Sequence, residues 1–519
     1  MSGGVRPFGG PEVRAPTGRE SAEADRRAIE DLGVPQPALM ENAGRAAASV
    51  VTRLFPRGEV VALVGSGNNG GDALVCLRTL ASWGRPVRAV LAGRRPEFEA
   101  VLHGWPLERI SGEESLPSIL AGASVVLDGI LGIGIRGAPR EPQADAIRRV
   151  NASGRPVVAL DVPSGVDADT GAVPGEAVVA DVTVAFGWPK LGLLMHPARG
   201  RVGRLLAFEI GFPPLEASHA SGHVLTPGWA ARHRPRRRAV THKNDVGSLL
   251  VVAGSEGMAG AAALAGRSAL RAGAGLVRIA SVEANRTVLQ GAVPEAVFVR
   301  ATDESALARA FEASSAVVVG PGLGTSEEAE EILRRVLAGP ARPTLFDADA
   351  LNLLAAGRPS VLSEAVDGRP SVLTPHPGEM SRLTGGNAPE MASDRAAFAR
   401  GWSAENGAVL LLKGTPSLVA APGLPLLVDA VGTSDLATGG MGDVLSGAVG
   451  AFLAQGVDPR TAAGLGLHTS GRAAARSRRA AGLLPTDVVD LLPSVLQEDG
   501  PGDTDLDLPG LVFDQDPAR

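Results

Sequence analysis

Residues 432–449 read GTSDLATGGMGDVLSGAV, and this stretch is the most informative part of the chain. Its glycines are typical of a helix N-terminus at which backbone N–H groups bind phosphate oxygens. Asp443 follows the last glycine of the loop, where its carboxylate could take a proton from a hydroxyl facing the phosphate. The alternative is a strand-to-helix turn in which Asp443 only caps the helix. The motifs elsewhere in the chain favour the functional interpretation.

The composition is that of a large globular protein. The chain has 519 residues, of which 45% are hydrophobic and 20% are charged, so several domains could each bury a core. The absence of tyrosine and the net charge of −6 argue against a nucleic-acid partner or an anionic membrane surface. The single cysteine, Cys76, excludes an internal disulfide and is expected to be a buried thiol. Without a signal-peptide pattern or a run of about eighteen apolar residues, a cytoplasmic protein is expected.

Short apolar runs alternate with helical stretches along the whole chain. Examples are VVALVG (60–65) and VVALDV (157–162) in the first half, and SLLVVAG (248–254) and AVLLLKG (408–414) in the second. Such strands predict parallel sheets that helices cover on both faces. We therefore expect an α/β fold with two domains.

We expect the two domains to span residues 1–222 and 223–519. The stretch 211–229 has little periodicity, and the basic residues at 231–243 are interpreted as an exposed connector rather than a nucleic-acid segment. About 18 residues at the start and about 25 at the end are expected to be disordered.

Polar and glycine-rich turns follow the strands of the second half, at the sheet edge where ligands bind in open α/β sheets. His376 lies between two prolines and is interpreted as a substrate contact, because the stretch lacks further metal ligands at matched spacing. Lys413 offers a cation for nucleotide phosphates, the alternative being a surface lysine at a turn. The motifs are GAGLV (273–277), which lies near the end of the glycine-rich stretch 247–280, then GPGLG (320–324), DADALNLL (347–354), LTPHPGEM (373–380) and LLLKGTPS (410–417).

Together with ATGGMGD, these ordered motifs resemble the ribokinase-like family, and more closely the nucleotide-dependent NAD(P)H-hydrate dehydratases, over residues 240–492. The resemblance implies a ribokinase-like α/β/α domain that uses Mg²⁺ and, by analogy with bacterial members, ADP. It implies that Asp443 accepts the proton of the hydrate's C6 hydroxyl as that oxygen is phosphorylated, after which elimination restores the reduced ring. It implies contacts with the hydrate at Ala261, Gly322, His376 and Asp443, and contacts with the adenine nucleotide at Lys413, Gly414, Thr415, Pro416, Ser417 and Gly442. Pro416 departs from the smaller residue that some members have.

Four loops follow strands in the first half. In GSGNNGGDALVC (65–76), two amides and a carboxylate occupy a turn where a simple phosphate loop would have only N–H donors. Their oxygens could hold a monovalent cation, or these residues could only form the turn and cap a helix. The other loops are LDGILGIGIRGAP (127–139), LDVPSGVDADTG (160–171) and FGWPKLGLLMHPARG (186–200).

With an upstream helix at 25–44, these loops resemble the NAD(P)H-hydrate epimerases over residues 20–212. The resemblance implies a Rossmann-like three-layer α/β/α domain with Asp161 and Lys190 as candidates for proton transfer at C6. It implies K⁺ ligands at Asn69, Asp128 and Ser164. It implies substrate contacts at Asn68, Asn69, Gly70, Gly71, Asp72, Gly132, Ile133, Gly134, Ile135, Arg136, Gly137, Ala138 and Asp161. Gln143 stands near the position at which relatives often have a tyrosine.

The two resemblances together imply a bifunctional repair enzyme for nicotinamide cofactors. Its epimerase would interconvert the R and S forms of NADH hydrate and NADPH hydrate, and its dehydratase would convert the S form to NAD(P)H while ADP gives AMP and phosphate. A homo-oligomer is expected from the same resemblance. The alternative is a ribokinase-like vitamin kinase fused to a non-catalytic epimerase-like binding domain.

Overall fold

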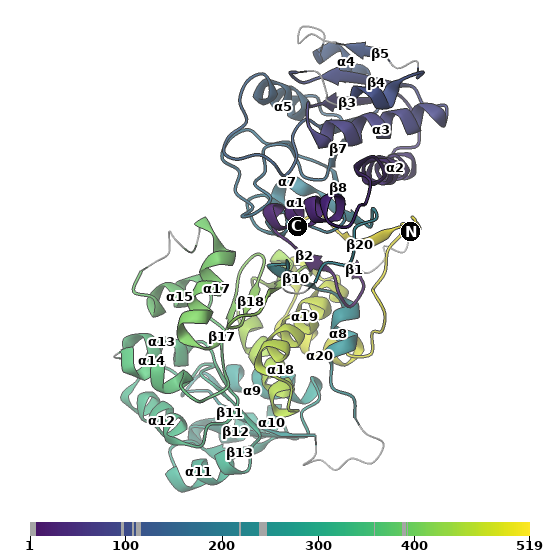
Figure 1. Cartoon of the computed structure of the whole chain (residues 1–519). Coiled ribbons are helices and arrows are strands. Elements are labelled where there is room, and N and C mark those ends of the chain that lie inside the picture. The colour runs from purple at the N-terminus through teal and green to yellow at the C-terminus, as the bar shows by residue number, and fades with distance from the viewer. Residues whose placement is uncertain are drawn as a thin grey trace. The chain divides into compact units, whose positions relative to one another are not determined.

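The structure is a computed structural model that describes residues 7–94, 98–105, 108–110, 116–216, 219–237, 246–357, 359–386, 391 and 393–518. The chain folds into two compact units (Figure 1). The first unit comprises residues 1–224 and 501–519, and the second comprises residues 225–500. Residues 501–519 therefore belong to the first unit, whereas the sequence placed them in the second domain.

The first unit is built on a sheet with the strand order β1-β20-β9-β8-β7-β6-β3-β4-β5. Strands β3 to β9 pair with one another in parallel, whereas β20 is antiparallel to both β1 and β9. The strands are β1 (Phe8–Gly9), β3 (Val60–Val64), β4 (Val87–Leu91), β5 (Glu108–Ile110), β6 (Val125–Gly129), β7 (Val157–Leu160), β8 (Val182–Phe186), β9 (Arg204–Phe208) and β20 (Leu511–Gln515). Strand β2 (Arg14–Ala15) pairs antiparallel with β10 (Gly222–Leu225). The helices are α1 (Gly18–Glu30), α2 (Gln36–Leu54), α3 (Asn68–Ser82), η1 (Glu99–Leu102), α4 (Leu116–Gly122), α5 (Gln143–Ala152), α6 (Leu191–Leu194) and α7 (Arg199–Val202).

Helices cover both faces of this sheet. On β3, Ala62 and Val64 pack with residues of α2 and α3, whereas Val61 and Leu63 pack with residues of α4 and α5. Successive side chains of a strand point to opposite faces, so a fully apolar strand needs a helical layer on each side. The expected three-layer α/β/α arrangement is confirmed for this unit.

The second unit contains a sheet with the order β13-β12-β11-β14-β15-β16-β17-β18-β19. Strands β11 to β17 pair in parallel, and β18 and β19 are antiparallel to their neighbours. The strands are β11 (Ser248–Val252), β12 (Leu276–Ser281), β13 (Val297–Arg300), β14 (Ala316–Val319), β15 (Thr344–Phe346), β16 (Ser371–Leu373), β17 (Val409–Leu412), β18 (Leu418–Ala420) and β19 (Leu426–Asp429).

One helical layer of the second unit contains α9 and α18, which pack against each other and against the sheet (Figure 1). A side chain at Gly447 would approach Ala265 O to 2.1 Å, so glycine lets α18 pack closely on α9. The helices are α8 (Pro227–His233), α9 (Ala259–Arg271), η3 (Glu283–Asn285), α10 (Arg286–Ala292), α11 (Glu304–Glu312), α12 (Glu327–Ala338), α13 (Asp349–Ala356), α14 (Pro359–Val366), α15 (Pro377–Leu383), α17 (Arg395–Asn406), η4 (Ser434–Leu436), α18 (Met441–Ala454), α19 (Pro459–Ser477), η5 (Ala480–Gly482) and α20 (Pro485–Val495).

The expectation that the ends of the chain are disordered is wrong for the described residues from 7 onward and up to 518, whereas residues 1–6 and 519 lie outside the described residues. Strand β20, coloured yellow in Figure 1, pairs antiparallel with β9 and with β1 in the first unit. Phe513 is fully buried, and Asp514 accepts hydrogen bonds from Arg204 at 2.8 and 2.7 Å. An apolar anchor and a paired buried carboxylate are enough to order a segment that is otherwise polar.

The segments 25–44 and 211–229 also differ from what their sequence predicts. The expected helix over 25–44 is two helices, because α1 ends at Glu30 and α2 begins at Gln36, after Gly33 with φ of +70° and Pro35. The aperiodic stretch 211–229 contains β10 and the start of α8, whose Trp229 is buried. Of the basic connector 231–243, residues 238–243 lie outside the described residues.

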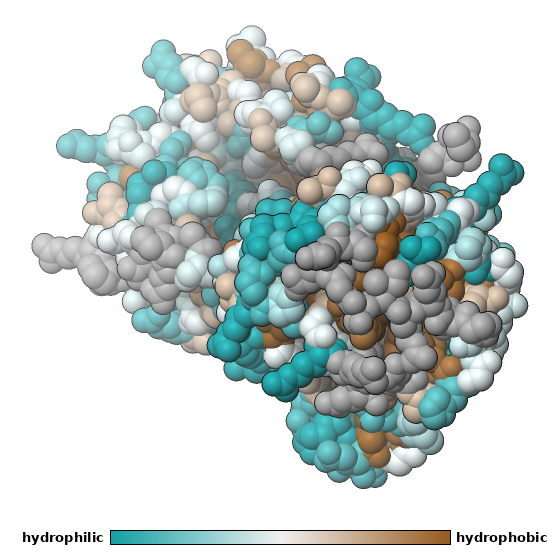
Figure 2. Space-filling view, turned by 90° about the horizontal axis from the view of Figure 1, so that it is seen from above, coloured by the Kyte–Doolittle hydropathy of each residue, from teal (hydrophilic) through white to brown (hydrophobic). Residues whose placement is uncertain are grey.

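Figure 2 shows hydrophilic and hydrophobic side chains interspersed over the face in view. Exposed large hydrophobic residues such as Trp83, Val288 and Leu424 lie on different elements. Among the helices that the structure describes, none is long and apolar enough to cross a membrane.

Candidate active sites

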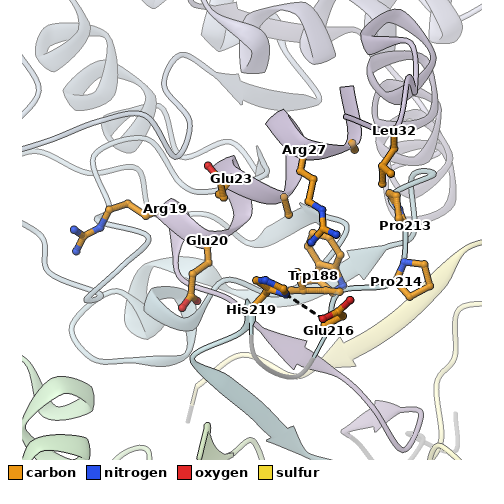
Figure 3. A pocket seen from close by; sticks show the side chains of 13 residues that line it. Arg19, Glu20, Glu23, Arg27, Leu32, Trp188, Pro213, Pro214, Glu216 and His219 are labelled. Carbon is orange, nitrogen blue, oxygen red and sulfur yellow. Dashed lines mark ion pairs between the residues drawn. The ribbon is translucent and has the colours of Figure 1, made fainter. Parts of the chain in front are cut away.

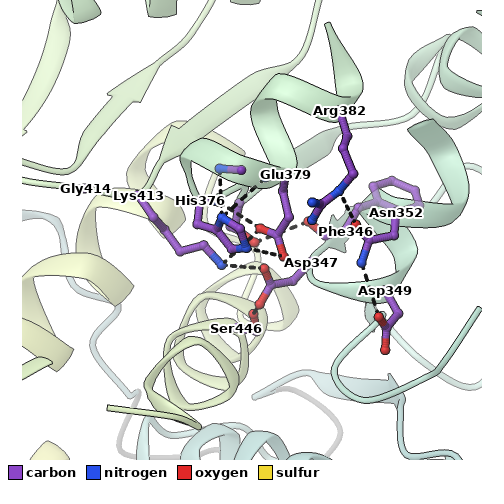
Figure 4. A network of polar contacts seen from close by, with 12 residues as sticks. Phe346, Asp347, Asp349, Asn352, His376, Glu379, Arg382, Lys413, Gly414 and Ser446 are labelled. Carbon is purple, nitrogen blue, oxygen red and sulfur yellow. Dashed lines mark hydrogen bonds and ion pairs between the residues drawn. The ribbon is translucent and has the colours of Figure 1, made fainter. Parts of the chain in front are cut away.

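In the second unit, a buried ion pair joins the loops that follow β15 and β17. Lys413 Nζ donates to Asp347 Oδ1 at 2.8 Å, and Ser446 Oγ of α18 donates to Asp347 Oδ2 at 2.6 Å (Figure 4). Asp347 is 1% exposed. Although its burial raises the pKa of Asp347, the Lys413 charge and the two hydrogen bonds bring that pKa below its usual value. Lys413 is therefore part of a fixed polar network and not a free surface lysine.

His376 and Glu379 extend this network from the start of α15. His376 Nδ1 accepts hydrogen bonds from the N–H groups of Gly378 at 3.0 Å and Glu379 at 3.3 Å, so the ring caps the helix. Glu379 in turn accepts a hydrogen bond from His376 N at 2.8 Å and lies 3.8 Å from Lys413 Nζ. Because Nδ1 is an acceptor, a neutral His376 carries its proton on Nε2, which lies 3.4 Å from Glu379 Oε1. The half-exposed ring is thus held in one orientation.

Asp443 lies in the first turn of α18, close to the same ion pair. A Cβ at Gly442 would lie 3.6 Å from Lys413 Nζ and 3.7 Å from Asp347 Oδ2, so the helix N-terminus meets the pair directly. Gly440 precedes the helix with φ of +92°, which glycine adopts without strain. Burial, followed by the charge of Asp347, raises the pKa of Asp443 to about 6, and Lys413 opposes the rise. A carboxylate with this pKa is mostly ionised at neutral pH and still accepts a proton readily.

The predicted hydrate contacts Ala261 and Gly322 come together at the same edge of the sheet. Gly322 has φ of +58°, and a Cβ there would lie 2.9 Å from the Cβ of Ala261. Ala261 belongs to the first turn of α9 after β11, and Gly322 to the loop after β14. Both positions are small, so a ligand can approach the backbone here.

The predicted nucleotide contacts 413–417 form a closed turn after β17. Ser417 Oγ accepts a hydrogen bond from Gly414 N at 3.2 Å and donates one to Gly414 O at 3.0 Å. Thr415 is exposed and Pro416 is buried. Arg395 of α17 donates to two carbonyls of this turn, and sequence reasoning did not identify it.

In the first unit, the predicted catalytic pair Asp161 and Lys190 is in contact. Lys190 Nζ forms an ion pair with Asp161 Oδ1 and donates to Phe186 O at 2.8 Å. The side chain of Lys190 is 1% exposed and that of Asp161 is 13% exposed, so the carboxylate is the member open to a ligand. Asp161 also has φ of +60°, a conformation that is strained for a residue other than glycine and is found at functional sites.

Carboxylates from two helices surround this pair. Burial, and then the charge of Asp161, raises the pKa of Asp72 on α3 well above its usual value. The same two causes raise the pKa of Asp25 on α1, and Lys190 opposes both shifts. Asp25 was not predicted, because a half-buried aspartate within a charged amphipathic helix has no distinguishing sequence pattern.

The predicted cation ligands Asn69, Asp128 and Ser164 form one connected cluster. Ser164 Oγ donates to the buried Asp128 Oδ1 at 2.6 Å, and Asn69 Nδ2 donates to Leu131 O at 2.8 Å. Leu131 O also lies 3.2 Å from Ser164 Oγ. Among the described residues, the buried Asn69 Oδ1 has no hydrogen-bond partner. A buried oxygen without a donor is costly, and oxygen ligands suit hard cations, so these residues fit K⁺.

A Mg²⁺ ion in the second unit has a different chemical requirement. Within the described part of the chain, no group of three or more His, Cys, Asp or Glu side chains could hold a metal ion. Mg²⁺ commonly binds through one or two carboxylates, waters and the phosphates of a nucleotide. The carboxylates near Lys413 fit that requirement only together with a nucleotide.

The other predicted substrate contacts of the first unit have different surroundings. Asn68 is exposed, and residues 69–72 are buried at the start of α3. A Cβ at Gly70 would lie 2.0 Å from Gly65 O, so this glycine is required by packing. The loop 132–138 is mostly exposed, and its Arg136 donates to Asp169 at 2.8 Å.

A cavity of about 540 Å³ lies elsewhere in the first unit, against α1 (Figure 3). Its walls include Arg27, Trp188 and the segment 213–216. Trp188 stacks on Phe212 with ring centroids 5.0 Å apart. Of the described residues that line this cavity, none belongs to the predicted set of site residues.

The chain is similar to known proteins in both of its units. The family model described as NAD(P)H-hydrate dehydratase matches residues 249–494, and the one described as YjeF-related protein N-terminus matches residues 36–192. The chain is 35% identical to the bifunctional NAD(P)H-hydrate repair enzyme Nnr of Moorella thermoacetica, over 93% of this chain and 96% of that protein. It is 39% identical to the protein of the same name from Pyrobaculum aerophilum, over 93% of this chain and 98% of that one. A crystal structure of the ADP/ATP-dependent NAD(P)H-hydrate dehydratase of Bacillus subtilis, co-crystallised with ATP and Mg²⁺, is 32% identical, covers 52% of this chain and 96% of that one, and has a TM-score of 0.47.

Proposed function

The chain belongs to the family of bifunctional NAD(P)H-hydrate repair enzymes, and from this premise we propose how its two units divide the repair. The first unit interconverts the R and S forms of the hydrates of NADH and NADPH. The second unit converts the S form to NAD(P)H, and ADP is converted to AMP and phosphate. The observation that carries this proposal is the cluster of Asp443, Lys413 and Asp347 at the N-terminus of α18.

Dehydration begins with the transfer of the terminal phosphoryl group of ADP to the C6 hydroxyl oxygen of the hydrate. The bond from phosphorus to the AMP oxygen breaks, a bond to the hydroxyl oxygen forms, and Asp443 takes the hydroxyl proton. The N–H groups at the start of α18 and the ammonium of Lys413 stabilise the charge on the phosphoryl oxygens. Mg²⁺, when bound with the nucleotide, neutralises further phosphate charge.

The phosphorylated hydrate then loses phosphate. The bond from C6 to oxygen breaks, the departing phosphate takes up the proton from C5, and the electron pair of the C5–H bond re-forms the double bond of the dihydronicotinamide ring. The total reaction is hydrate plus ADP giving NAD(P)H, AMP and phosphate. Phosphorylation is required because hydroxide is a poor leaving group, and the protein contributes positioning and charge stabilisation.

In the first unit, Asp161 removes and returns the proton at C6 of the hydrate. The buried Lys190 stabilises the charge of the Asp161 carboxylate through their ion pair. The exposure of the two side chains supports these roles, because only the carboxylate has an open face. Asn69, Asp128 and Ser164 would hold K⁺, which supplies a fixed positive charge beside the loops that bind the hydrate. Epimerisation would therefore depend on Asp161 for proton exchange and on bound K⁺ for the structure of the loops that bind the hydrate.

Two substitutions test the division of labour in the full-length protein. Asp443→Asn is expected to abolish dehydration and leave epimerisation at the wild-type rate, and Lys190→Met is expected to do the reverse. Asp490→Asn, on the exposed face of α20, is the matched control for the loss of one carboxylate. Each rate is measured separately, dehydration from the return of reduced-nicotinamide absorbance and epimerisation from the ratio of the two hydrates without nucleotide. Loss of both activities in a folded Asp443→Asn variant would contradict the two-site proposal.

A further inference from the structure

Arg395 is a partly buried cation beneath the turn formed by residues 413–417. Its guanidinium Nη2 donates to Lys413 O at 3.3 Å and to Pro416 O at 3.5 Å. These contacts join the first residue of α17 to two carbonyls of the turn. No carboxylate of the described residues forms an ion pair with this guanidinium.

Gly414 provides the space for this side chain. A Cβ at position 414 would lie 2.5 Å from Arg395 Nη2 and 3.0 Å from Cζ. Any other residue at 414 would therefore push the guanidinium away from the turn. The glycine has φ of +152°, which lets the backbone pass over the flat guanidinium group.

The position of Arg395 at the N-terminus of α17 is energetically unfavourable for an arginine whose only partners are the two carbonyls of the turn. Positive charge at a helix N-terminus opposes the helix dipole. Burial lowers the pKa of Arg395, and its Nε is buried without a hydrogen-bond partner in the described residues. A residue with these costs needs a compensating interaction, and the two carbonyls of the turn supply only part of it.

The carbonyls that Arg395 engages are the groups that would repel a nucleotide. Carbonyl oxygens facing a phosphate are electrostatically unfavourable, whereas N–H groups and cations are favourable. By holding Lys413 O and Pro416 O, the guanidinium keeps both oxygens turned toward α17. Its positive charge, which no carboxylate among the described residues pairs with, also lies directly behind the turn, while the charge of Lys413 is shared with Asp347 and Glu379.

We infer that Arg395 is a positioning residue for the nucleotide, which shapes the 413–417 turn and supplies charge behind it without joining the chemical step. This inference rests on the proposed function, which makes that turn the nucleotide site. It assigns to α17 a part in nucleotide affinity, separate from the part of Asp443 in proton transfer. A pure affinity role changes KM for the nucleotide and leaves kcat and KM for the hydrate near their wild-type values.

The test compares ADP binding and dehydration kinetics in the full-length wild type and three variants. Arg395→Ala is expected to weaken ADP binding and raise KM for ADP roughly tenfold, the usual cost of lost charge-assisted hydrogen bonds. Arg395→Lys keeps the charge without the planar guanidinium and is expected to lose roughly threefold. The matched control is Arg369→Ala, because Arg369 also donates only to backbone carbonyls and a hydroxyl, has a buried unpaired Nε, and lies away from the turn.

Gly414→Ala tests the same contact from the turn, so the conclusion does not depend on one variant. If the packing of the guanidinium on Gly414 matters, the effects of Gly414→Ala and Arg395→Ala on KM for ADP will not add in the double variant. The inference is overturned if Arg395→Ala binds ADP as the wild type does, or if Arg369→Ala weakens binding equally. If the wild type binds neither ADP nor ATP, the proposed function fails and takes this inference with it.

Discussion

Asp443→Asn removes one negative charge from the first turn of α18 and keeps the shape of the side chain. In the wild type, burial and the nearby Asp347 raise the pKa of Asp443 from 3.8 to about 6. The ionised carboxylate of Asp443 is therefore less stable in the folded protein than in the unfolded chain. The substitution should abolish proton transfer and at the same time remove this destabilisation.

The stability effect has a defined sign and pH window. Because the folded pKa is raised, the wild type is penalised little below pH 3.8 and increasingly as the pH rises through about 6. Linkage gives a penalty of about 2 kcal/mol at pH 5 and about 3 kcal/mol at pH 8. Asparagine does not ionise, so Asp443→Asn should be more stable than the wild type, and more so at pH 8 than at pH 5.

The rate effect follows from the same pKa. Loss of a positioned general base typically slows a reaction by about 10²–10⁴-fold. In the wild type, about nine-tenths of Asp443 is ionised at pH 7 and about one-tenth at pH 5, so dehydration should fall roughly tenfold between these values. The return of reduced-nicotinamide absorbance measures the rate, and urea unfolding at pH 5 and pH 8 measures stability. A variant that keeps more than about a tenth of the wild-type rate, or is less stable at pH 8, would refute this reasoning.

Three further predictions concern the first unit. Asn69→Ala removes the unpaired Oδ1, so the K⁺ concentration that half-activates epimerisation should rise at least roughly tenfold; a K⁺ titration with Na⁺ at constant ionic strength measures it, and an unchanged response would contradict the cation site. Lys190→Met leaves Asp161 without its buried partner, which should cost about 3 kcal/mol of folding free energy in denaturant titration; no loss of stability would show that the pair is solvated. Phe513→Ala should destabilise the first unit by about 3–5 kcal/mol, because a buried phenylalanine leaves a cavity; an unchanged unfolding transition would mean that β20 does not pack as the structure has it.

The fold was predictable because its strands are short, apolar and β-branched, and polar turns follow them. Residues such as Val60–Val64 allow only a sheet covered on both faces. Parallel strands end at one edge, so the positions of Asp161, His376, Lys413 and Asp443 at strand and helix ends followed from the same pattern.

The partners of these residues could not be predicted in the same way. Ser446 lies 99 residues from Asp347 in the sequence. From the sequence alone it is only a small residue of an apolar helix, and its hydrogen bond to Asp347 is known only from the structure. Arg395 begins a helix with no nearby motif, and Asp25 lies in a charged helix. Tertiary contacts assign these roles, and local periodicity carries no information on them.

The C-terminal segment is expected from its composition to be disordered, but it contains the paired strand β20. DTDLDLPGLVFDQDPAR has the charge and proline content of a disordered tail, yet Phe513 is buried and Asp514 pairs with Arg204. Composition is an average over a segment, whereas a short strand such as β20 needs only a few residues that match its neighbours β1 and β9. The contact between β20 and β9 is therefore visible only in the structure.

The central claim is that one chain carries both repair activities. The measurement is made on the wild-type protein with ADP, Mg²⁺ and K⁺, in a mixture of both epimers of NADH hydrate, following the return of reduced-nicotinamide absorbance. The account predicts rapid and complete recovery, because the first unit converts the R form into the S form that the second unit consumes. Recovery that stops at the share of one epimer would contradict an active epimerase, and no recovery with either ADP or ATP would contradict the repair function itself.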